Sequence, residues 1–590
     1  QIEDVLELGG QFDLYLDVLP VGAGTIHLNT IEPSDYPWEG VYYKGIPIEM
    51  TAVANEGYEF IEWVSAPQID DGLNPYWTGE TYNNSLSFKK ITKDLWEINC
   101  SGVEEIIVRY NFYANQLDAG ACYLDENQLY LNPIHCMFYI VGRMEDEYKL
   151  NFDLPDNYVI ASSLTTNKHT LMVQGYDLLA DSPIICSDSL QHDYYEVNGI
   201  NFHLWFQGDC NPDWNKLKND FKNFTNTQIN CFGSFPSDEF HFFFQVTPYK
   251  SYHGVEHAKN TVLLIGPGDE IMTKRYEDLL GVCSHELYHV WNVKTIRPIE
   301  MYPYDYTKEN YFKTGYVAEG VTTYMGDLIL YSSGVFSWGE FAKTQNQNLE
   351  RHLMNYGRFN LSVADSGFDS WLDGYKLGAP DRKTSIYADA ALCMLMIDLE
   401  IIKNTNGKES LHSVMRELFH NYALKQKGYS EDEFISICIR LGGETVKKIF
   451  EDHIYGTKDY IPQLRSALDI VGIELVEKRN PNITAQYFGF ITIQQNGKFI
   501  IKKVEPNSEI DQSGIAPEDE LVKINGVEIS GDLSELLSNC PEEVSFTFKK
   551  KFFSKDVILK TGNYYPLLEI NKKYNSSKEQ LSLRKVWCNN

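Results

Sequence analysis

Residues 283–292 read CSHELYHVWN and place the pattern H-E-x-x-H in the middle of an apolar stretch with helical periodicity. At 3.6 residues per turn, His285 and His289 lie one turn apart on the same face, so both imidazoles can reach one ion. Zinc suits such a pair of nitrogen ligands. Glu286 is rotated by about 100° from His285, too far round the helix to be a third ligand. We therefore predict that Glu286 is the general base that takes a proton from a metal-bound water.

The third ligand must come from another segment, because a catalytic zinc takes three protein ligands and keeps a fourth position for water. Residues 317–324, VAEGVTTY, open the next strongly helical segment, and Glu319 there can complete a set of two histidines and one glutamate. The sequence thus predicts one Zn²⁺. Asp327, two turns further on, could orient a ligand imidazole, but a salt bridge on the helix surface would explain it equally well.

Length and charge restrict the class of protein. The chain has 590 residues, more than a single hydrophobic core usually supports, so three or four domains are expected. A formal net charge of −32 repels phosphate backbones, which makes nucleic acid an unsuitable partner. No apolar run reaches 18 residues, so we expect no membrane span. The eleven cysteines form no C-x-x-C pair, which argues against a disulfide framework and against a cysteine-based zinc site.

The order of apolar patterns predicts a multidomain α+β protein. Short alternating runs from residue 11 to about residue 154, such as residues 106–112, indicate antiparallel β structure. Strands are predicted again at residues 240–246 and 260–265. Beyond residue 480 strands return, with turn signals at Asn496-Gly497, Pro506-Asn507 and Asn525-Gly526. Between these β regions, long helical segments are predicted near residues 276–294, 316–334, 387–403 and 409–424.

Extended around the metal motif, the chain resembles the glycyl aminopeptidase family, a group of gluzincin metallopeptidases that carry a PDZ domain. Residues 285–294, HELYHVWNVK, continue into Ile296-Arg297-Pro298 as the family's zinc helix does, and residues 318–324 resemble the segment that supplies its third ligand. Residues 252–257, YHGVEH, resemble the family's Gly-Gly-Leu-Glu-His motif on the strand that borders the cleft, with a histidine in place of the first glycine. The resemblance implies that this strand binds the substrate through Gly254, Val255 and Glu256, and that Glu256 captures the substrate's α-ammonium group.

Residues 385–392, SIYADAAL, resemble a further stretch of the family, Tyr-Tyr-x-Lys-Gly, although Asp389-Ala390 stands where the family has Lys-Gly. The resemblance implies that the phenol of Tyr387 stabilises the oxyanion. Such a donor lowers the barrier by a few kcal/mol when it points at the developing charge. A tyrosine that only packs in the core is the alternative.

The C-terminal part resembles a PDZ domain. Tyr487-Phe488-Gly489-Phe490, followed by a predicted strand, resembles a PDZ carboxylate-binding loop. Such a domain binds the carboxy terminus of a peptide by adding it as a strand to an exposed sheet edge. A PDZ-like domain that binds no ligand and packs on the catalytic domain is the alternative.

The resemblance covers the chain from about residue 106 to the end and implies a domain order there, whereas the first hundred residues do not match the family well. We expect a small β-rich module at residues 1–100, the rest of an N-terminal β-sandwich at 101–165 and a thermolysin-like, mainly helical zinc peptidase domain at 166–478. A PDZ-like domain at 479–575 and a C-terminal tail at 576–590 follow. Residues 22–26 and 57–63 resemble a module of bacterial surface proteins. This resemblance favours an exported protein, periplasmic or extracellular, and leaves the cytoplasm open.

The function predicted from these residues is that of a zinc-dependent aminopeptidase. It would hydrolyse the first peptide bond of peptides with a free amino terminus, with glycine or alanine first, as the family name suggests. One alternative is an endopeptidase with the same zinc chemistry, whose substrates are recruited by the PDZ-like domain. Another is a non-catalytic binding or surface protein that kept the fold.

Overall fold

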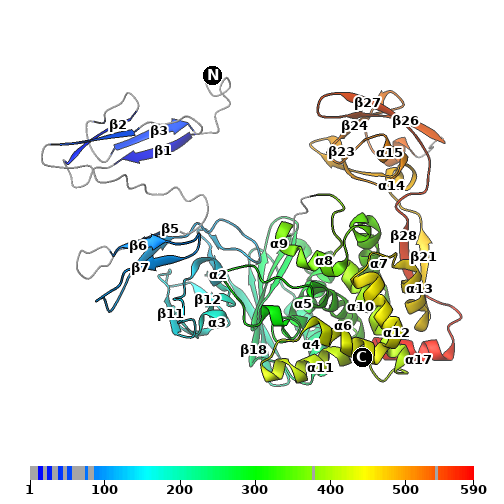
Figure 1. Ribbon diagram of the computed structural model, residues 1–590, viewed down its shortest axis with the longest axis horizontal. Helices are drawn as coiled ribbons and strands as arrows, with labels where there is room; N and C mark the ends of the chain where they lie inside the picture. The colour runs from blue at the N-terminus through cyan, green and yellow to red at the C-terminus, as the bar shows by residue number, and fades with distance from the viewer. Residues whose placement is uncertain are drawn as a thin grey trace. The chain divides into compact units, whose positions relative to one another are not determined.

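Strands fill both ends of the chain, and helices fill most of its middle (Figure 1). The chain is therefore a mixed α/β protein of several parts, as the apolar patterns predict. Residue contacts divide it into two compact units, Gln1–Tyr113 and Ala114–Asn590. The structure is a computed structural model that describes residues 11–16, 23–28, 33, 38–43, 50–55, 74–77, 86–374, 379–537 and 542–589.

The first unit contains antiparallel strand pairs in its described residues. Residues 106–112, predicted as a strand, contain β8 (Val108–Asn111), which pairs with β5 (Asn74–Trp77). Of the stretches that resemble a surface-protein module, residue 22 and residues 57–63 lie outside the described residues. The other pairs are β1 (Gln11–Leu16) with β3 (Trp38–Tyr43), β2 (Gly24–Leu28) with β4 (Met50–Ala54) and β6 (Phe88–Lys90) with β7 (Trp96–Ile98).

Two small antiparallel sheets open the second unit, with strand orders β12-β15-β10-β9 and β11-β14-β13. Tyr130 and Ile185 of the first of these sheets pack on Phe243 and Val262 of the larger sheet that follows. The elements are β9 (Tyr123–Leu124), β10 (Gln128–Leu131), α2 (Pro133–Cys136), β11 (Glu147–Asn151), β12 (Val159–Ala161), β13 (Thr165–Asn167), β14 (Thr170–Gln174), α3 (Tyr176–Ala180) and β15 (Ile184–Ser187).

The larger sheet has five strands in the order β16-β17-β18-β20-β19, and its last strand forms an open edge. Strands β17, β18 and β20 are parallel, and the long helix α4 (Trp214–Phe232) connects the first two of them. The predicted strands at 240–246 and 260–265 are confirmed as β18 and β20. The strand bounds are β16 (Gln191–Val197), β17 (Ile200–Gln207), β18 (Glu239–Val246), β19 (Ser251–Glu256) and β20 (Asn260–Gly266).

The helical middle packs against one face of this sheet as a single hydrophobic core. Its central helix, α10 (Ala388–Asn404), has almost no exposed residue. All four predicted helical segments are present, but the first ends at Tyr288, so the predicted end near residue 294 is wrong. The long helices are α5 (Tyr276–Tyr288), α6 (Thr322–Ser332), α7 (Trp338–Met354), α10, α11 (Leu411–Asn421), α12 (Glu431–Ile449) and α13 (Ile461–Ile470). Short helical turns are η1 (Gly268–Glu270), η2 (Ile299–Met301), η3 (Tyr316–Val321), η4 (Tyr356–Phe359), α8 (Val363–Phe368), α9 (Ser370–Asp373), η5 (Ala423–Lys425) and η6 (Phe450–Ile454).

A separate β-sheet with its own core lies near the end of the chain, in the order β22-β23-β24-β26-β27. The Asn496-Gly497 and Asn525-Gly526 turns both have two positive φ angles, as tight hairpin turns of this type require. The bounds are β21 (Ile473–Lys478), which pairs with β28 (Leu567–Lys572), α14 (Ile483–Phe488), β22 (Phe490–Gln495), β23 (Lys498–Val504), α15 (Glu509–Gln512), β24 (Glu520–Ile524), β25 (Val527–Glu528), α16 (Leu533–Leu536), β26 (Glu543–Lys549), β27 (Ser554–Lys560) and α17 (Lys578–Asn589).

Helix α17 anchors the end of the chain in the helical core through Trp587. The indole is 1% exposed and donates a hydrogen bond of 2.7 Å to the Tyr324 hydroxyl. We expect Trp587→Ala to lower the free energy of unfolding by about 3–5 kcal/mol, because it removes a fully buried aromatic side chain. Denaturant unfolding of the full chain measures this. Leu581→Ala, at a half-exposed position of the same helix, is the control and should change it by less than about 0.5 kcal/mol.

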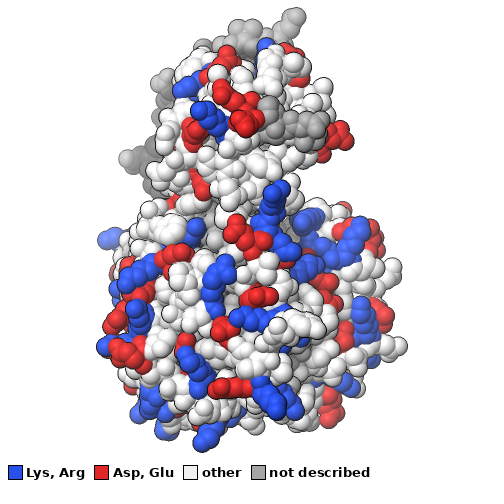
Figure 2. Space-filling view, turned by 90° about the vertical axis from the view of Figure 1, so that its right-hand side faces the viewer, with Lys and Arg blue, Asp and Glu red and all other residues white. Residues whose placement is uncertain are grey.

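Charged side chains of both signs share the surface. Figure 2 shows one face of the molecule, on which Lys and Arg lie among Asp and Glu. The net negative charge therefore produces no uniformly acidic surface on that face. In the part of the chain that the structure describes, no helix has the length and apolar character needed to cross a bilayer.

Candidate metal centre and cleft

The predicted metal ligands meet at the C-terminal end of α5. His285 Nε2 lies 3.0 Å from His289 Nε2, and Glu319 Oε2 lies 3.4 Å and 3.5 Å from these two nitrogens. Ligand atoms arranged tetrahedrally around zinc, at metal–ligand distances of about 2.0–2.1 Å, lie about 3.3 Å from one another. The three side chains are therefore spaced as zinc ligands are.

The tautomer of His289 also suits a metal. Its Nδ1 lies 2.8 Å from the backbone oxygen of Asn292. Because a carbonyl oxygen can only accept, Nδ1 carries the proton and the lone pair of Nε2 is left for an ion. A backbone partner of this kind is a common way to orient a ligand imidazole.

Asn292 joins the two segments that supply the ligands. Its side-chain amide donates to the backbone oxygens of Val317 and Ala318 and to Thr322 Oγ1, over 2.8–3.0 Å. These contacts hold the turn η3, which is a π-helix and carries Glu319. Single π turns within helices are frequent at functional sites. The sequence pattern predicts no role for Asn292, because its contacts are tertiary; only its place directly after the zinc motif points to it.

Buried carboxylates dominate the electrostatics of the centre. Burial opposes protonation of His289, yet the nearby Glu256 and Glu319 raise its pKa to about 10. Despite burial, the same histidine and His285 hold the pKa of Glu319 far below its usual range. Burial raises the pKa of Glu286 well above normal, which makes this carboxylate a strong base. The acidic side chains around His289 thus favour positive charge at this place, and a dication would supply it.

The donor set fits a zinc ion. Two imidazoles and one carboxylate form a ligand set typical of catalytic zinc, and Glu286 is not needed as a ligand. Glu319 Oε2 and Glu286 Oε2 are both buried and lack a hydrogen-bond partner within the described residues. Buried polar oxygens are rarely left unpaired, so an ion and its water would satisfy the two groups.

A cleft of about 400 Å³ lies beside the ligands and is bordered by the open edge of β19. Gly254 of this strand lies against the carboxylate of Glu286: a Cβ added there would come within 2.3 Å of Glu286 Oε1. Glu256 ends the strand, and its carboxylate lies within 4.8 Å of ligand atoms of both Glu286 and His289. Val255 faces the neighbouring small sheet, in the same cluster as Phe243.

Two further predicted residues line the cleft. The ring of Tyr387, just before α10, stacks on His285 at 6.4 Å between centroids. Asp327 accepts a hydrogen bond of 3.2 Å from Gln345. Among the described residues it makes no hydrogen bond with either ligand imidazole, so its suggested orienting role stays a prediction.

Two family models match the chain. The M61 glycyl aminopeptidase model covers residues 278–393, and the peptidase M61 N-terminal domain model covers residues 79–188. The resemblance to the glycyl aminopeptidase family is confirmed. The glycyl aminopeptidase model spans the three metal ligands, Glu286 and Tyr387, whereas Glu256 lies outside both matched segments.

A solved structure shows a similar fold. A crystal structure of an aminopeptidase N family protein from Idiomarina loihiensis matches 86% of this chain and 91% of that chain, with a TM-score of 0.77 and 22% sequence identity. An M1 zinc metallopeptidase from Deinococcus radiodurans, with a bound Tyr-Ser-Ala substrate, matches 66% of this chain and 86% of that chain. Its TM-score of 0.42 and 11% identity are too low to support any conclusion. No curated protein matches the chain.

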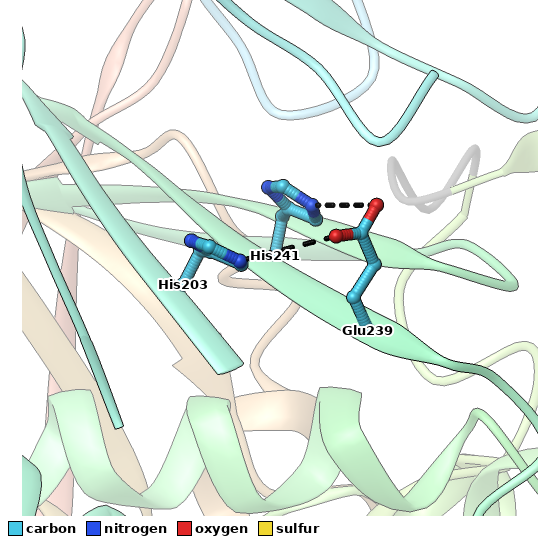
Figure 3. A group of neighbouring side chains, drawn as sticks. All are labelled: His203, Glu239 and His241. Atoms are coloured by element: carbon cyan, nitrogen blue, oxygen red, sulfur yellow. Dashed lines mark ion pairs between the residues drawn. The ribbon is translucent and has the colours of Figure 1, made fainter. Parts of the chain in front are cut away.

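A second cluster of ligand-type residues lies outside the segments that match the glycyl aminopeptidase models. His203 and His241 are neighbours on parallel strands, and Figure 3 shows the carboxylate of Glu239 facing one nitrogen of each ring. The separations are 3.9 Å and 3.6 Å. However, the indole N–H of Trp205 donates to His241 Nδ1 over 3.1 Å, so the neutral ring carries its proton on Nε2. That is the nitrogen that would have to bind the ion, so this arrangement does not fit a metal.

The stretch predicted as a PDZ carboxylate-binding loop lies largely in a helix. Tyr487 and Phe488 end α14, Gly489 caps it with a φ of 73°, and Phe490 begins β22. The Gly489 N–H donates to Ala485 within the helix, and both phenylalanines are buried in the core of the C-terminal sheet. The backbone N–H of Gly489 is therefore already used inside the protein.

Proposed function

We propose that the chain is a zinc-dependent aminopeptidase with a thermolysin-like catalytic domain and a single catalytic zinc. One observation carries this proposal: the carboxylate of Glu256 lies beside the proposed metal ligand His289 and the base Glu286. An acid beside these two residues can bind the amino terminus of a substrate whose first peptide bond lies at the metal. The match to the glycyl aminopeptidase family supports the same reaction.

His285, His289 and Glu319 would hold the zinc. When bound, zinc lowers the pKa of a water toward about 7 and polarises the scissile carbonyl. The protein's own groups move the proton. Glu286, buried and of raised pKa, takes it from the attacking water and returns it to the leaving amine. Because its Oε2 has no other partner among the described residues, this carboxylate is available for both transfers.

Tyr387 supplies a hydrogen-bond donor to the reacting carbonyl, opposite the metal. Its ring lies over His285 at the rim of the cleft, within reach of a substrate held at the metal. A phenol in this position stabilises the developing oxyanion more than it stabilises the ground-state carbonyl. Asp327 is not required for this step. We propose for it only a role in orienting a ligand imidazole.

Glu256 determines which peptide bond is cleaved. Its carboxylate pairs with the substrate's α-ammonium and so aligns the first peptide bond with the base. A small first residue, glycine or alanine, is proposed from the name of the matched family. The open edge of β19 offers the backbone groups that hold the following residues as an added strand.

Blocking the substrate's amino group tests this function. We expect kcat/KM for N-acetylated alanyl peptides to be lower than for free ones by at least about 30-fold, because the charged pair with Glu256 is lost. Glu256→Gln should remove most of that difference, because it should lower kcat/KM only for the peptides with a free amino terminus. Liquid chromatography of the cleavage products measures both.

Equal cleavage of acetylated and free peptides would instead favour an endopeptidase that shares this zinc chemistry. The six-stranded C-terminal sheet, PDZ-like in our proposal, has β22 at one edge, and this strand could receive the carboxy terminus of a recruited protein. Absence of any hydrolysis, with partner binding intact, would favour a non-catalytic binding protein.

A further inference from the structure

One face of helix α7 borders the cleft, with Lys343, Thr344, Gln347, Asn348 and Arg351 at helical spacing. Two of these side chains are cationic. Lys343 is neutralised by Glu277, whose carboxylate lies 2.7 Å from its ammonium group. The positive charge that remains for a ligand is that of Arg351.

Arg351 is unusual among the arginines of the catalytic region. Every other arginine between residues 166 and 478 donates a hydrogen bond to a protein group. Within the described residues, Arg351 makes no hydrogen bond, ion pair or ring contact, although it is a lining residue of the cleft. A planar guanidinium with all its donors unused is suited to bind a carboxylate in a bidentate manner.

The direction of the bound substrate brings its far end toward this arginine. A peptide whose amino terminus is held at Glu256, the last residue of β19, can pair with the strand only by running antiparallel to it. Its chain then passes Gly254 and continues toward Tyr252. Arg351 lines the same cleft as Tyr252 and Asp327. Burial raises the pKa values of both residues, and the positive charge of Arg351 opposes this rise.

We propose that Arg351 binds the free α-carboxylate of short peptides, so that the enzyme prefers peptides of a few residues to the amino termini of long chains. This proposal rests on the aminopeptidase function proposed above. The substrate would then be held at both ends, by Glu256 at its ammonium group and by Arg351 at its carboxylate. Peptides of the wrong length could make only one of these two contacts.

The test compares alanyl peptides of two to five residues, each as the free acid and as the C-terminal amide. An amide keeps the size of the acid but carries no charge. For the preferred length we expect kcat/KM of the acid to exceed that of the amide by at least about tenfold, mainly through KM. Arg351→Met should bring this ratio close to one, and Arg351→Lys should restore part of it. Lys343→Met removes a charge on the same face of α7 that is already paired with Glu277. It should leave the acid-to-amide ratio of kcat/KM as in the wild type.

The outcomes separate the two proposals. If no alanyl peptide is hydrolysed in either form, the aminopeptidase function fails and this inference fails with it. If acids and amides are hydrolysed equally at every length, or if the ratio survives Arg351→Met, the role of Arg351 alone is wrong. Circular dichroism and zinc content of the variants, unchanged from the wild type, would show that a lost ratio does not come from misfolding.

Discussion

Replacing Glu286 with glutamine is expected to lower kcat by a factor of about 10³–10⁴ while the protein keeps one zinc per chain. Glutamine has the same shape but cannot take a proton from water, and general-base catalysis contributes about that much. The metal should stay bound, because the ligand atoms of His285, His289 and Glu319 form a complete set without Glu286. Steady-state kinetics on an alanyl peptide and elemental analysis of the same sample measure the two quantities.

His285→Ala is the control for this experiment and should lose the zinc together with the activity. A Glu286→Gln protein within about tenfold of the wild-type rate, or one without zinc, would contradict the proposed role of Glu286. The same elemental analysis tests the cluster of His203, Glu239 and His241. A second zinc that disappears in His241→Ala would show that our argument from the Trp205 hydrogen bond is wrong.

The sequence predicted the metal pair because the spacing of His285 and His289 is a local property of the helix. Glu319 was also found, since it opens the next helical segment. The π-helical shape of that turn was beyond the sequence pattern, because it depends on hydrogen bonds from Asn292, which lies 25–30 residues earlier in the chain. Tertiary contacts of this kind leave no periodic signal.

The end of the zinc helix was missed for a similar reason. The apolar period continues to about residue 294, but Val293 takes a φ of 104°, which is rare for a β-branched residue and ends the helical path. Lys294 then pairs over 2.8 Å with Asp181, which lies 113 residues earlier in the chain. A long-range ion pair and strained backbone therefore override the local preference for helix.

The close approach of Gly254 to Glu286 could not be predicted either, and it leads to the second large effect. Gly254→Ala is expected to lower kcat/KM by at least about 100-fold, with zinc content unchanged. The new Cβ would lie 2.3 Å from Glu286 Oε1 and 2.6 Å from its Cδ, so one of the two must move. Strand β19 is held along its length by β20, so the carboxylate is displaced instead, and a shift of about 1 Å can cost 100-fold in rate.

Gly281→Ala is the matched control, because it adds the same methyl group to another glycine of the same cleft. The nearest atom to its Cβ would be the Tyr252 hydroxyl at 4.0 Å, an ordinary contact. This substitution lies inside α5, where alanine in place of glycine should stabilise the protein by about 0.5–1 kcal/mol. Activity within about threefold of the wild type is expected for Gly281→Ala. The same result for Gly254→Ala would mean that Glu286 is not confined by β19.

Combining Gly254→Ala with Glu286→Gln separates a displaced base from a blocked cleft. If the methyl group acts only by displacing the Glu286 carboxylate, the double variant should be no slower than Glu286→Gln alone. In that variant the general base is already lost, so there is nothing further for the methyl group to disturb. If the methyl instead obstructs the substrate, the two losses should multiply, and most of the Gly254→Ala effect should appear in KM. The contact between this glycine and Glu286 predicts the first result, because the methyl group points at the base rather than at the path of the peptide.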